Sequence, residues 1–300
     1  MSKILEIIQL IGGDFKTWLF RVGAVLLLIF FLVVALGGVS QNDRWKIDHV
    51  EVSGAQAVSD TAILDLTRSL LVGNYYFTYA RENSYLFPRF EISKRLLETF
   101  PRLKSVYASR VDNHTIRVEV TERSPFALWC GGSYSSEKQA LRDCWFIDDT
   151  GFIFDHAPVF SDGVYLEVYA ALDGKKDDTV LGAHIPEPRF SLAYSVNEGI
   201  KKSLGDTLRV IIKPEGEYGI VMKSSTTYPL LSGTEIRFKD NVSPEKFIKN
   251  LLAALEVQFP GVQSADSESI SAKMLYYIDM RFGNKIFFGF EPERTIPISE

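Results

Sequence analysis

The sequence predicts an α+β protein with a single N-terminal transmembrane helix, then a β-α-α-β-β domain, and then a mostly antiparallel β domain with two helices. Three observations support this prediction. One long apolar run near the N-terminus carries no charge, many short segments alternate apolar with polar residues, and four segments place apolar residues at helical spacing. At 300 residues, the chain has room for an anchor and two domains.

The composition is that of a folded protein and argues against a nucleic-acid binder. Hydrophobic residues make up 46% of the chain and charged residues 24%, an ordinary globular mixture. The formal net charge is -5, and no long basic run occurs. Proteins that bind nucleic acid neutralise phosphates with clustered Lys and Arg, so we expect no nucleic-acid partner here.

Residues 22–39 read VGAVLLLIFFLVVALGGV and predict a transmembrane helix. Eighteen uncharged residues are just enough to cross a bilayer, and Trp18 stands at the entrance as an interface anchor. The alternative is a signal peptide cleaved near Ala35-Leu36-Gly37. The apolar region of a signal peptide usually has about 7–15 residues, however, so this run favours an uncleaved anchor.

The orientation of the anchor follows from the basic residues around it. Lys3, Lys16 and Arg21 precede the run, whereas Arg44 and Lys46 follow it, so the positive-inside bias is weak. It favours a cytoplasmic segment at residues 1–21, with the later domains outside the cytoplasmic membrane. The apolar residues of that first segment allow either a helix lying along the membrane surface or a simple short helix.

The first predicted domain covers residues 45–124 and has the order β-α-α-β-β. Ser59 is expected to cap the first helix, and Pro88 and Pro101 to bound the second. The strands are expected at residues 45–53, 103–111 and 115–122, with an aromatic, irregular stretch at 75–87 between the helices. A three-stranded sheet with two helices on one face can bury one core at this size.

The second predicted domain covers residues 125–291, and residues 292–300 form a short tail. Its helices are expected at 190–204 and after Ser243-Pro244, where a cap precedes a first-turn proline. Short strands are expected at 126–129, 144–147, 151–154, 164–170, 208–214, 218–223 and 233–238. The last element is a hairpin, YYIDMRFGNKIFFGF, whose Gly283-Asn284 link predicts a II′-type turn. Alternation there places Tyr276, Ile278, Met280 and Phe282 on one face.

Cys130 and Cys144 are expected to form a disulfide. They stand in nearly mirrored Trp-Cys and Cys-Trp pairs, so antiparallel pairing of their strands would bring the two Cβ atoms face to face. A disulfide fits an oxidising compartment. Two free buried thiols or a partial metal site are the alternatives, but no Cys-x-x-Cys or histidine pairing supports zinc.

The sequence shows no motif of a catalytic, metal or cofactor site. The four histidines are scattered, and neither a phosphate-binding loop nor a nucleophile elbow is present. The carboxylates of Asp148 and Asp149 fall in a predicted turn, where we expect them to be solvated. We therefore predict a protein that is not an enzyme and takes no cofactor, metal or small-molecule substrate.

Four runs along the chain share the pattern of one family. They are Ile47–Gly54 (IDHVEVSG), Thr115–Trp129 (TIRVEVTERSPFALW), Phe146–Phe154 (FIDDTGFIF) and Tyr277–Phe282 (YIDMRF). Their order behind a single anchor resembles the bacterial cell-division proteins FtsQ and DivIB, over most of residues 22–290. The turn at residues 112–114, the loop between the cysteines and the long aromatic stretch at 75–87 depart from that pattern.

The resemblance implies a fold and a non-enzymatic function. The β-α-α-β-β domain looks like the POTRA domain of that family. Family members act in the division complex at the septum, where they recruit the coiled-coil membrane proteins FtsB and FtsL, act with other divisome components, and influence septal peptidoglycan synthesis. FtsB adds a strand to the free edge of the last strand of the C-terminal domain. Arg281, Phe282 and Phe290 match the family's partner-contacting Arg, Tyr and Trp.

The residues of the last strand, read without the family, favour the same site. Lys285, Ile286, Phe287, Phe288 and Phe290 form an apolar run after which no further strand is expected. An uncovered apolar edge is an aggregation hazard unless a partner pairs with it. The alternative is that this strand only closes the core.

A second hypothesis assigns binding to the first domain instead. In it, the protein is a POTRA-type chaperone or transport-associated module of the cell envelope, and the β-α-α-β-β unit carries the binding site. Such proteins normally carry repeated POTRA units or a membrane barrel, and the sequence predicts neither. A membrane-anchored envelope enzyme is a third, weaker reading.

Overall fold

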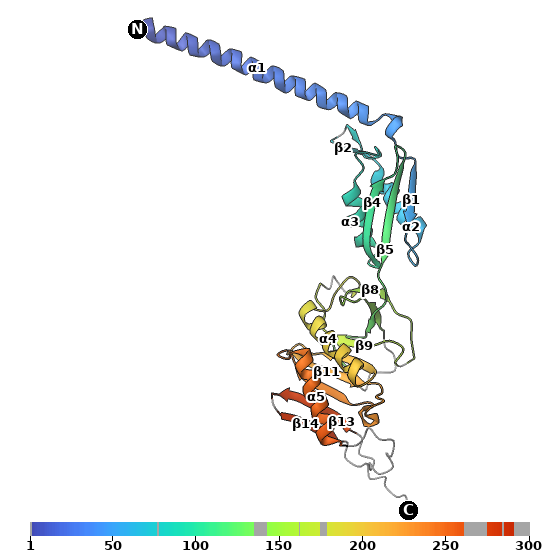
Figure 1. The fold of residues 1–300 in the computed structure, drawn as a ribbon. Coiled ribbons are helices and arrows are strands. Elements are labelled where there is room, and N and C mark those ends of the chain that lie inside the picture. The colour runs from blue at the N-terminus through green and yellow to red at the C-terminus, as the bar shows by residue number, and fades with distance from the viewer. Residues whose placement is uncertain are drawn as a thin grey trace, which may run out of the picture. The chain divides into compact units, whose positions relative to one another are not determined.

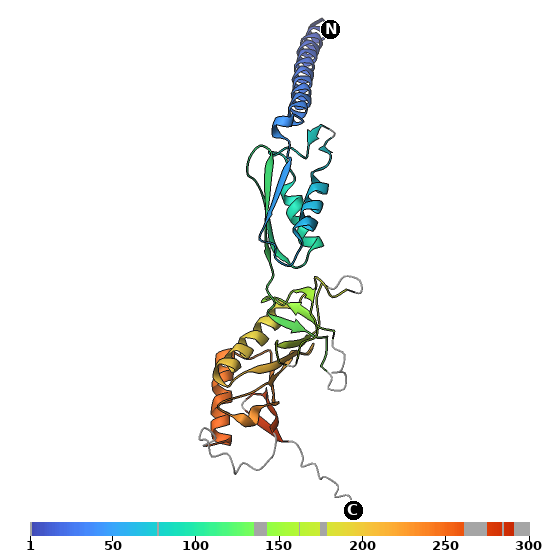
Figure 2. The same cartoon turned by 90° about the vertical axis from the view of Figure 1, so that its right-hand side faces the viewer.

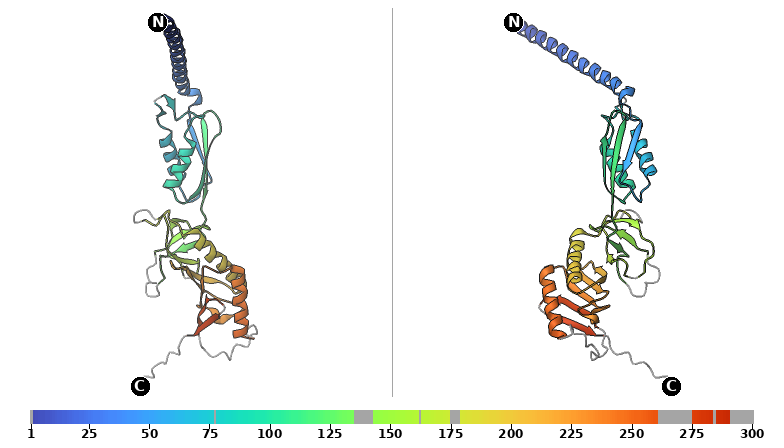
Figure 3. Two further views of the ribbon diagram at one scale, coloured as in Figure 1. Left: turned by 90° about the vertical axis from the view of Figure 1, so that its left-hand side faces the viewer. Right: turned by 45° about the vertical axis from the view of Figure 1, so that its right-hand side comes forward.

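The computed structural model describes residues 2–76, 78–134, 143–161, 163–174, 179–260, 275–283 and 285–290. The chain divides into two compact units, Met1–Glu122 and Arg123–Glu300 (Figure 1, and two further views in Figure 3). Both units combine helices with a sheet, so the chain is a mixed α+β protein, as the sequence predicts.

The first unit begins with one long helix, α1 (Ser2–Ser40). Its segment Thr17–Ser40 has 24 residues and contains an 18-residue window with a mean hydropathy of 2.9, so it is long and apolar enough to cross a membrane. The helix is longer than the predicted residues 22–39. Residues 2–21 continue the same helix and do not form a separate element.

The remainder of the first unit has the predicted order β-α-α-β-β, preceded by a short 3₁₀ helix and with one additional hairpin. The elements are η1 (Asp43–Trp45), β1 (His49–Ser53), α2 (Asp60–Leu71), β2 (Asn74–Tyr75), β3 (Tyr79–Ala80), α3 (Arg89–Thr99), β4 (Leu103–Arg110) and β5 (Thr115–Glu122). The sheet order is β1-β5-β4, with β1 parallel to β5, and Figure 2 shows both helices on one side of it. The addition is the small β2–β3 hairpin, which lies in the stretch expected to be irregular.

The core of this unit follows the periodicities in the sequence. Ile116 and Val118 of β5 are fully buried, and so are Ile63 of α2 and Ile92 of α3, because the helices present these residues to one face of the sheet. Two details differ from expectation. The Ser59 hydroxyl bonds the hydroxyl of Thr61 and does not cap α2, and Leu97 is 36% exposed.

The second unit is built on one nine-stranded sheet. Its elements are β6 (Ala127–Trp129), β7 (Trp145–Ile147), β8 (Ile153–His156), β9 (Glu167–Ala170), α4 (Glu187–Ser203), β10 (Thr207–Ile212), β11 (Glu217–Met222), η3 (Pro229–Leu231), β12 (Glu235–Lys239), α5 (Pro244–Gln258), β13 (Leu275–Phe282) and β14 (Lys285–Phe290). The strand order is β14-β13-β12-β11-β10-β9-β6-β7-β8. Five of the eight neighbouring pairs of described strands are antiparallel, so the sheet is mostly antiparallel, as predicted.

Two β-α-β crossovers lie within this sheet and place both helices. α4 joins the parallel neighbours β9 and β10, and α5 lies between the parallel neighbours β12 and β13. The two crossovers step the same way along the sheet from strands of the same direction, so right-handed connections put both helices on one face. There α4 packs against α5, and a Cβ on Gly199 would lie 2.8 Å from Cγ1 of Ile248.

The main core of the second unit lies between the sheet and these helices. Val196 and Ile200 of α4, Leu251 and Leu255 of α5, and Ile278 of β13 are fully buried in it. A smaller apolar cluster, which includes Leu128, Cys144, Phe146, Phe154 and Ala157, belongs to the β6–β8 part of the sheet.

The prediction that Asp148 is solvated in a turn is wrong, because its side chain is buried. It is 1% exposed, and its Oδ1 accepts hydrogen bonds from the backbone N–H of Thr150 (2.9 Å), the hydroxyl of Thr150 (2.6 Å) and the backbone N–H of Phe152 (3.1 Å). Its Oδ2 accepts from Arg123. The carboxylate therefore stabilises the turn between β7 and β8 from the inside.

Candidate functional site

β14 forms one end of the nine-stranded sheet. It pairs antiparallel with β13, and the strand order places no described strand on its other side. One row of backbone N–H and C=O groups therefore faces away from the sheet, as at any edge strand. This edge coincides with the last strand that the sequence singled out.

The side chains of β14 alternate between the core and the surface. Ile286 and Phe288 are half-buried and pack against the main core, where the Phe288 ring lies edge-on to Phe259, 5.7 Å away. Lys285, Phe287 and Phe290 are exposed, the two aromatic residues by 48% and 39%. The two-residue period of a strand places Phe287 on the face opposite Ile286 and Phe288, and Phe290 on the same face as these two, at the partly exposed end of the strand. β14 therefore closes the core with one face and presents Phe287 with the other.

The alternation predicted for β13 is only partly correct. Ile278 and Met280 both face the core, but Tyr276 and Phe282 are 56% and 57% exposed. The register between β13 and β14 shifts between Leu275 and Tyr277 and again between Asp279 and Phe282. These irregularities break the two-residue period at both ends of the strand. At its end, the Phe282 ring lies edge-on to Phe287, 5.6 Å away.

Arg281 is held by two carboxylates of its own chain. Its Nε and Nη2 donate to the two oxygens of Asp279 at 2.9 and 2.6 Å, and its Nη1 donates to Glu217 of β11 at 2.6 Å. The Arg281 guanidinium holds the pKa of Asp279 below its usual range, although burial acts in the opposite direction. The carboxylate of Asp279 in turn raises the pKa of Arg281. A partner's carboxylate would have to compete with this arrangement.

A second group of polar and aromatic contacts lies beside Arg281. Arg237 of β12 donates to Glu235 from Nε (2.8 Å) and Nη2 (2.6 Å), and its guanidinium lies over the ring of Tyr277 at 4.5 Å. Tyr277 pairs with Gly289 of β14, and its ring occupies the space that a Cβ on Gly289 would need. Sequence reasoning missed Glu217, Arg237 and Tyr277 as members of this site. Tyr277 is flagged only by its place within the YIDMRF run.

The hairpin turn is described in part. Gly283 has a φ of +65°, which the first central residue of a primed hairpin turn requires. Asn284 lies outside the described residues, so the II′ class of the turn stays a prediction. The predicted tail at residues 292–300 also lies outside them.

Cys130 and Cys144 are joined by a disulfide in the structure. The pairing of Trp129 with Trp145 across β6 and β7 places the two cysteines opposite each other, with their Cα atoms 4.3 Å apart. The bond lies beside β6 and β7, the seventh and eighth strands of the sheet when β14 is counted as the first. It closes a loop there and does not belong to the β14 edge.

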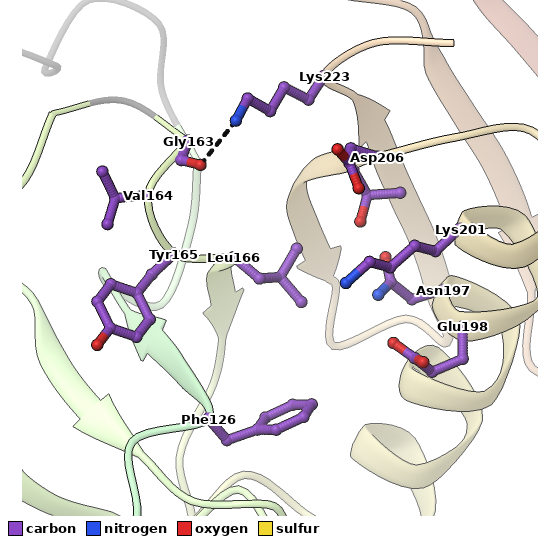
Figure 4. A pocket seen from close by; sticks show the side chains of 11 residues that line it. Phe126, Gly163, Val164, Tyr165, Leu166, Asn197, Glu198, Lys201, Asp206 and Lys223 are labelled. Carbon is purple, nitrogen blue, oxygen red and sulfur yellow. Dashed lines mark hydrogen bonds between the residues drawn. The ribbon is translucent and has the colours of Figure 1, made fainter. Parts of the chain in front are cut away.

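A pocket of about 280 Å³ lies between α4 and the loop before β9. Figure 4 shows Asn197, Glu198 and Lys201 of α4 on one side, and Lys223 bonded to the carbonyl of Gly163 at 2.9 Å. Asn197 is 2% exposed, and its Oδ1 has no hydrogen-bond partner among the described residues. Both acidic and basic side chains line the pocket, and the residues that line it include no histidine or cysteine.

The described residues contain no cluster of three His, Cys, Asp or Glu side chains that could hold a metal ion. Comparison of the sequence with protein-family models and with curated proteins finds no match. The membership suggested by the four sequence runs therefore stays a prediction, and the function must be argued from the residues.

Proposed function

We propose that this chain is a membrane-anchored scaffold of the bacterial division septum, related to FtsQ and DivIB. It recruits FtsB/FtsL-like coiled-coil membrane proteins and links them to septal peptidoglycan synthesis. The single observation that carries the proposal is β14, an edge strand with exposed Phe287 and Phe290 and with no described strand on its outer side. A partner strand would take main-chain hydrogen bonds from the edge and side-chain contacts from the two rings.

The layout of the chain supports the same proposal. One apolar helix precedes a β-α-α-β-β unit, which we propose is a POTRA domain, and a larger unit that ends in the edge strand. The disulfide fits an oxidising compartment outside the cytoplasmic membrane. In this proposal the N-terminal end of α1 lies in the cytoplasm, and the chain that follows α1 lies outside.

Matched substitutions test where the binding site lies. Phe290→Asp places a charge at the partly exposed end of β14, and Phe90→Asp makes the same change on α3 of the first unit, where Phe90 is 84% exposed. Calorimetry with an FtsB-like coiled-coil peptide and the full-length protein in detergent should show that Phe290→Asp abolishes binding and Phe90→Asp does not. Circular dichroism should confirm that both variants are folded.

If Phe90→Asp abolishes binding and Phe290→Asp does not, the first unit carries the binding site. This result would favour a chaperone or transport-associated module. Unchanged affinity in both variants would exclude strand addition to β14. Ile286→Pro is a second probe of the strand, since proline removes a backbone donor. A fluorescent fusion of the full chain tests the cellular role, with a signal at midcell expected and an even signal around the envelope contradicting it.

A further inference from the structure

The aromatic insert between α2 and α3 packs against the end of α1. The side-chain hydroxyl of Tyr79 donates to the backbone carbonyl of Val33 at 2.8 Å. Gln41, just past the helix, donates from Nε2 to the carbonyl of Thr78 at 2.9 Å. The β2–β3 hairpin is therefore fixed to the last two turns of the helix.

Two helix residues, one turn apart, allow this close packing. A Cβ on Gly37 would lie 2.7 Å from Cβ of Thr78, so only glycine fits at this position without a shift. Ser40 is 7% exposed, its Oγ accepts from the N–H of Ala80 at 3.1 Å, and its carbonyl accepts from Nδ2 of Asn83 at 2.8 Å. A flexible tether would not bury and satisfy these polar groups.

The position of the contact sets the depth of the hairpin in a membrane. Val33 lies seven residues before the end of the candidate span, which is about 10 Å along the helix axis. A span of 24 residues is only a little longer than a hydrocarbon core of about 30 Å. If α1 crosses the bilayer, the hairpin therefore lies where the headgroups meet the acyl chains.

The side chains exposed around this hairpin are apolar or aromatic, as is common for residues at a membrane interface. Tyr76 is 89% exposed and Val72 is 75% exposed. Trp45, just after the helix, lies edge-on to Tyr85 at 6.4 Å, and Tyr85 is 54% exposed. Trp and Tyr are enriched at membrane interfaces because they combine an apolar ring with a polar group.

We infer that this aromatic hairpin is a second membrane-contacting element, which inserts into the lipid interface beside α1 and fixes the orientation of the first unit at the bilayer. The inference rests on the membrane span of the proposed function, but not on partner binding at β14. The hairpin would contact the same lipid interface that surrounds the end of α1, because hydrogen bonds fix the hairpin to that end of the helix.

Lipid-attached quenchers test this inference on the full chain in phosphatidylcholine vesicles. The natural cysteines are joined to each other, so a single Cys introduced at Tyr76 can carry an environment-sensitive fluorophore. The emission should shift to the blue and lose intensity with a quencher placed near the headgroups. Ser105→Cys is the control, because Ser105 is exposed on β4 and pairs with Thr121, near the end of β5 that is distant from His49 and the helix.

Two further variants make the result decisive. Gly37→Leu should release the hairpin and reduce the quenching at position 76, whereas Gly38→Leu should not, since a Cβ on Gly38 meets no atom within 4 Å. A label at Leu28 in the middle of the span tests the premise with a deep quencher. If that label is quenched but the label at 76 is quenched no more than the one at 105, the hairpin does not contact lipid. If the label at Leu28 is not quenched, the membrane span itself is wrong.

Discussion

The ring of Tyr277 covers Gly289, the residue paired with it across β13 and β14. This contact explains why a glycine interrupts the aromatic run of the edge strand. The Arg237 guanidinium stacks on the same ring, so the contact connects the edge of the sheet to β12. The edge strand is thus held by side-chain contacts as well as by main-chain pairing.

Gly289→Ala should destabilise the second unit. Its Cβ would overlap the Tyr277 ring, and overpacking of this kind costs about 1–3 kcal/mol. Urea unfolding of the full-length protein in detergent measures the loss. The double variant Tyr277→Ala/Gly289→Ala removes the overlap and should be less unstable than the two single changes predict together. Strict additivity would show that the overlap is not the cause.

Arg281→Ala should mainly reduce the stability of the second unit and should affect partner binding less. It leaves Asp279, which is 5% exposed, without its two hydrogen bonds from the guanidinium, and we expect a loss of about 2 kcal/mol. Glu217→Gln removes only the outer carboxylate and should cost less. Thermal unfolding measures both effects. If Arg281→Ala leaves stability unchanged but weakens peptide binding, the main role of Arg281 is contact with the partner.

Asp148 should give the second unit a dependence on acid pH. Burial alone would raise its pKa, but hydrogen bonds from Thr150, Phe152 and Arg123 outweigh burial, and the pKa lies below its ordinary value. A lowered pKa gives stability that is present above about pH 4 and is lost as the pH falls through the folded-state value. Unfolding free energies measured from pH 7 downward should show this loss.

The matched variants are Asp148→Ala and Asp149→Ala. The first should cost about 3 kcal/mol at neutral pH, because it removes the buried carboxylate that accepts hydrogen bonds from Thr150, Phe152 and Arg123, and it should flatten the acid dependence. The second changes an exposed neighbour and should have a small effect. Equal effects of the two would contradict the role assigned to Asp148.

Glu122→Gln should loosen the connection between β1 and α2. Oε1 of Glu122 accepts the consecutive N–H groups of Gln56, Ala57 and Val58 at 2.8–2.9 Å, and Oε2 accepts from Arg102. Charge-assisted bonds are stronger than neutral ones, so neutralising this carboxylate should cost about 1–2 kcal/mol. Glu119→Gln on the same strand is the control, since Glu119 is exposed. Faster hydrogen exchange at residues 56–58 in Glu122→Gln alone would support the role, and equal exchange in both variants would contradict it.

Glu122 and Arg123, in the run Thr115–Trp129, show what a sequence pattern can and cannot predict. The pair marks the division between the two units, which falls between Glu122 and Arg123. The sequence does not indicate that Glu122 binds three N–H groups of a loop 64 to 66 residues away, or that Arg123 pairs with a buried Asp148. Such bonds depend on which loops the sheets bring together.

The elements that could be predicted from the sequence are those whose signal is local. The apolar run of α1, the alternation of β5 and the Ser243-Pro244 start of α5 are periodic or positional patterns that need no distant contact. The same reasoning located the last hairpin, because its strands and its glycine turn are adjacent in the chain.

The pairing of these elements could not be predicted from the sequence and is known from the three-dimensional structure alone. The two parallel crossovers, the salt bridge from Arg281 to Glu217 of β11, and the packing of Gly37 against Thr78 join residues far apart in the sequence. The shifts in register that expose Tyr276 and Phe282 depend on the neighbouring strand. Periodicity records which side of an element is apolar, whereas pairing depends on chain topology and on long-range contacts that no local pattern contains.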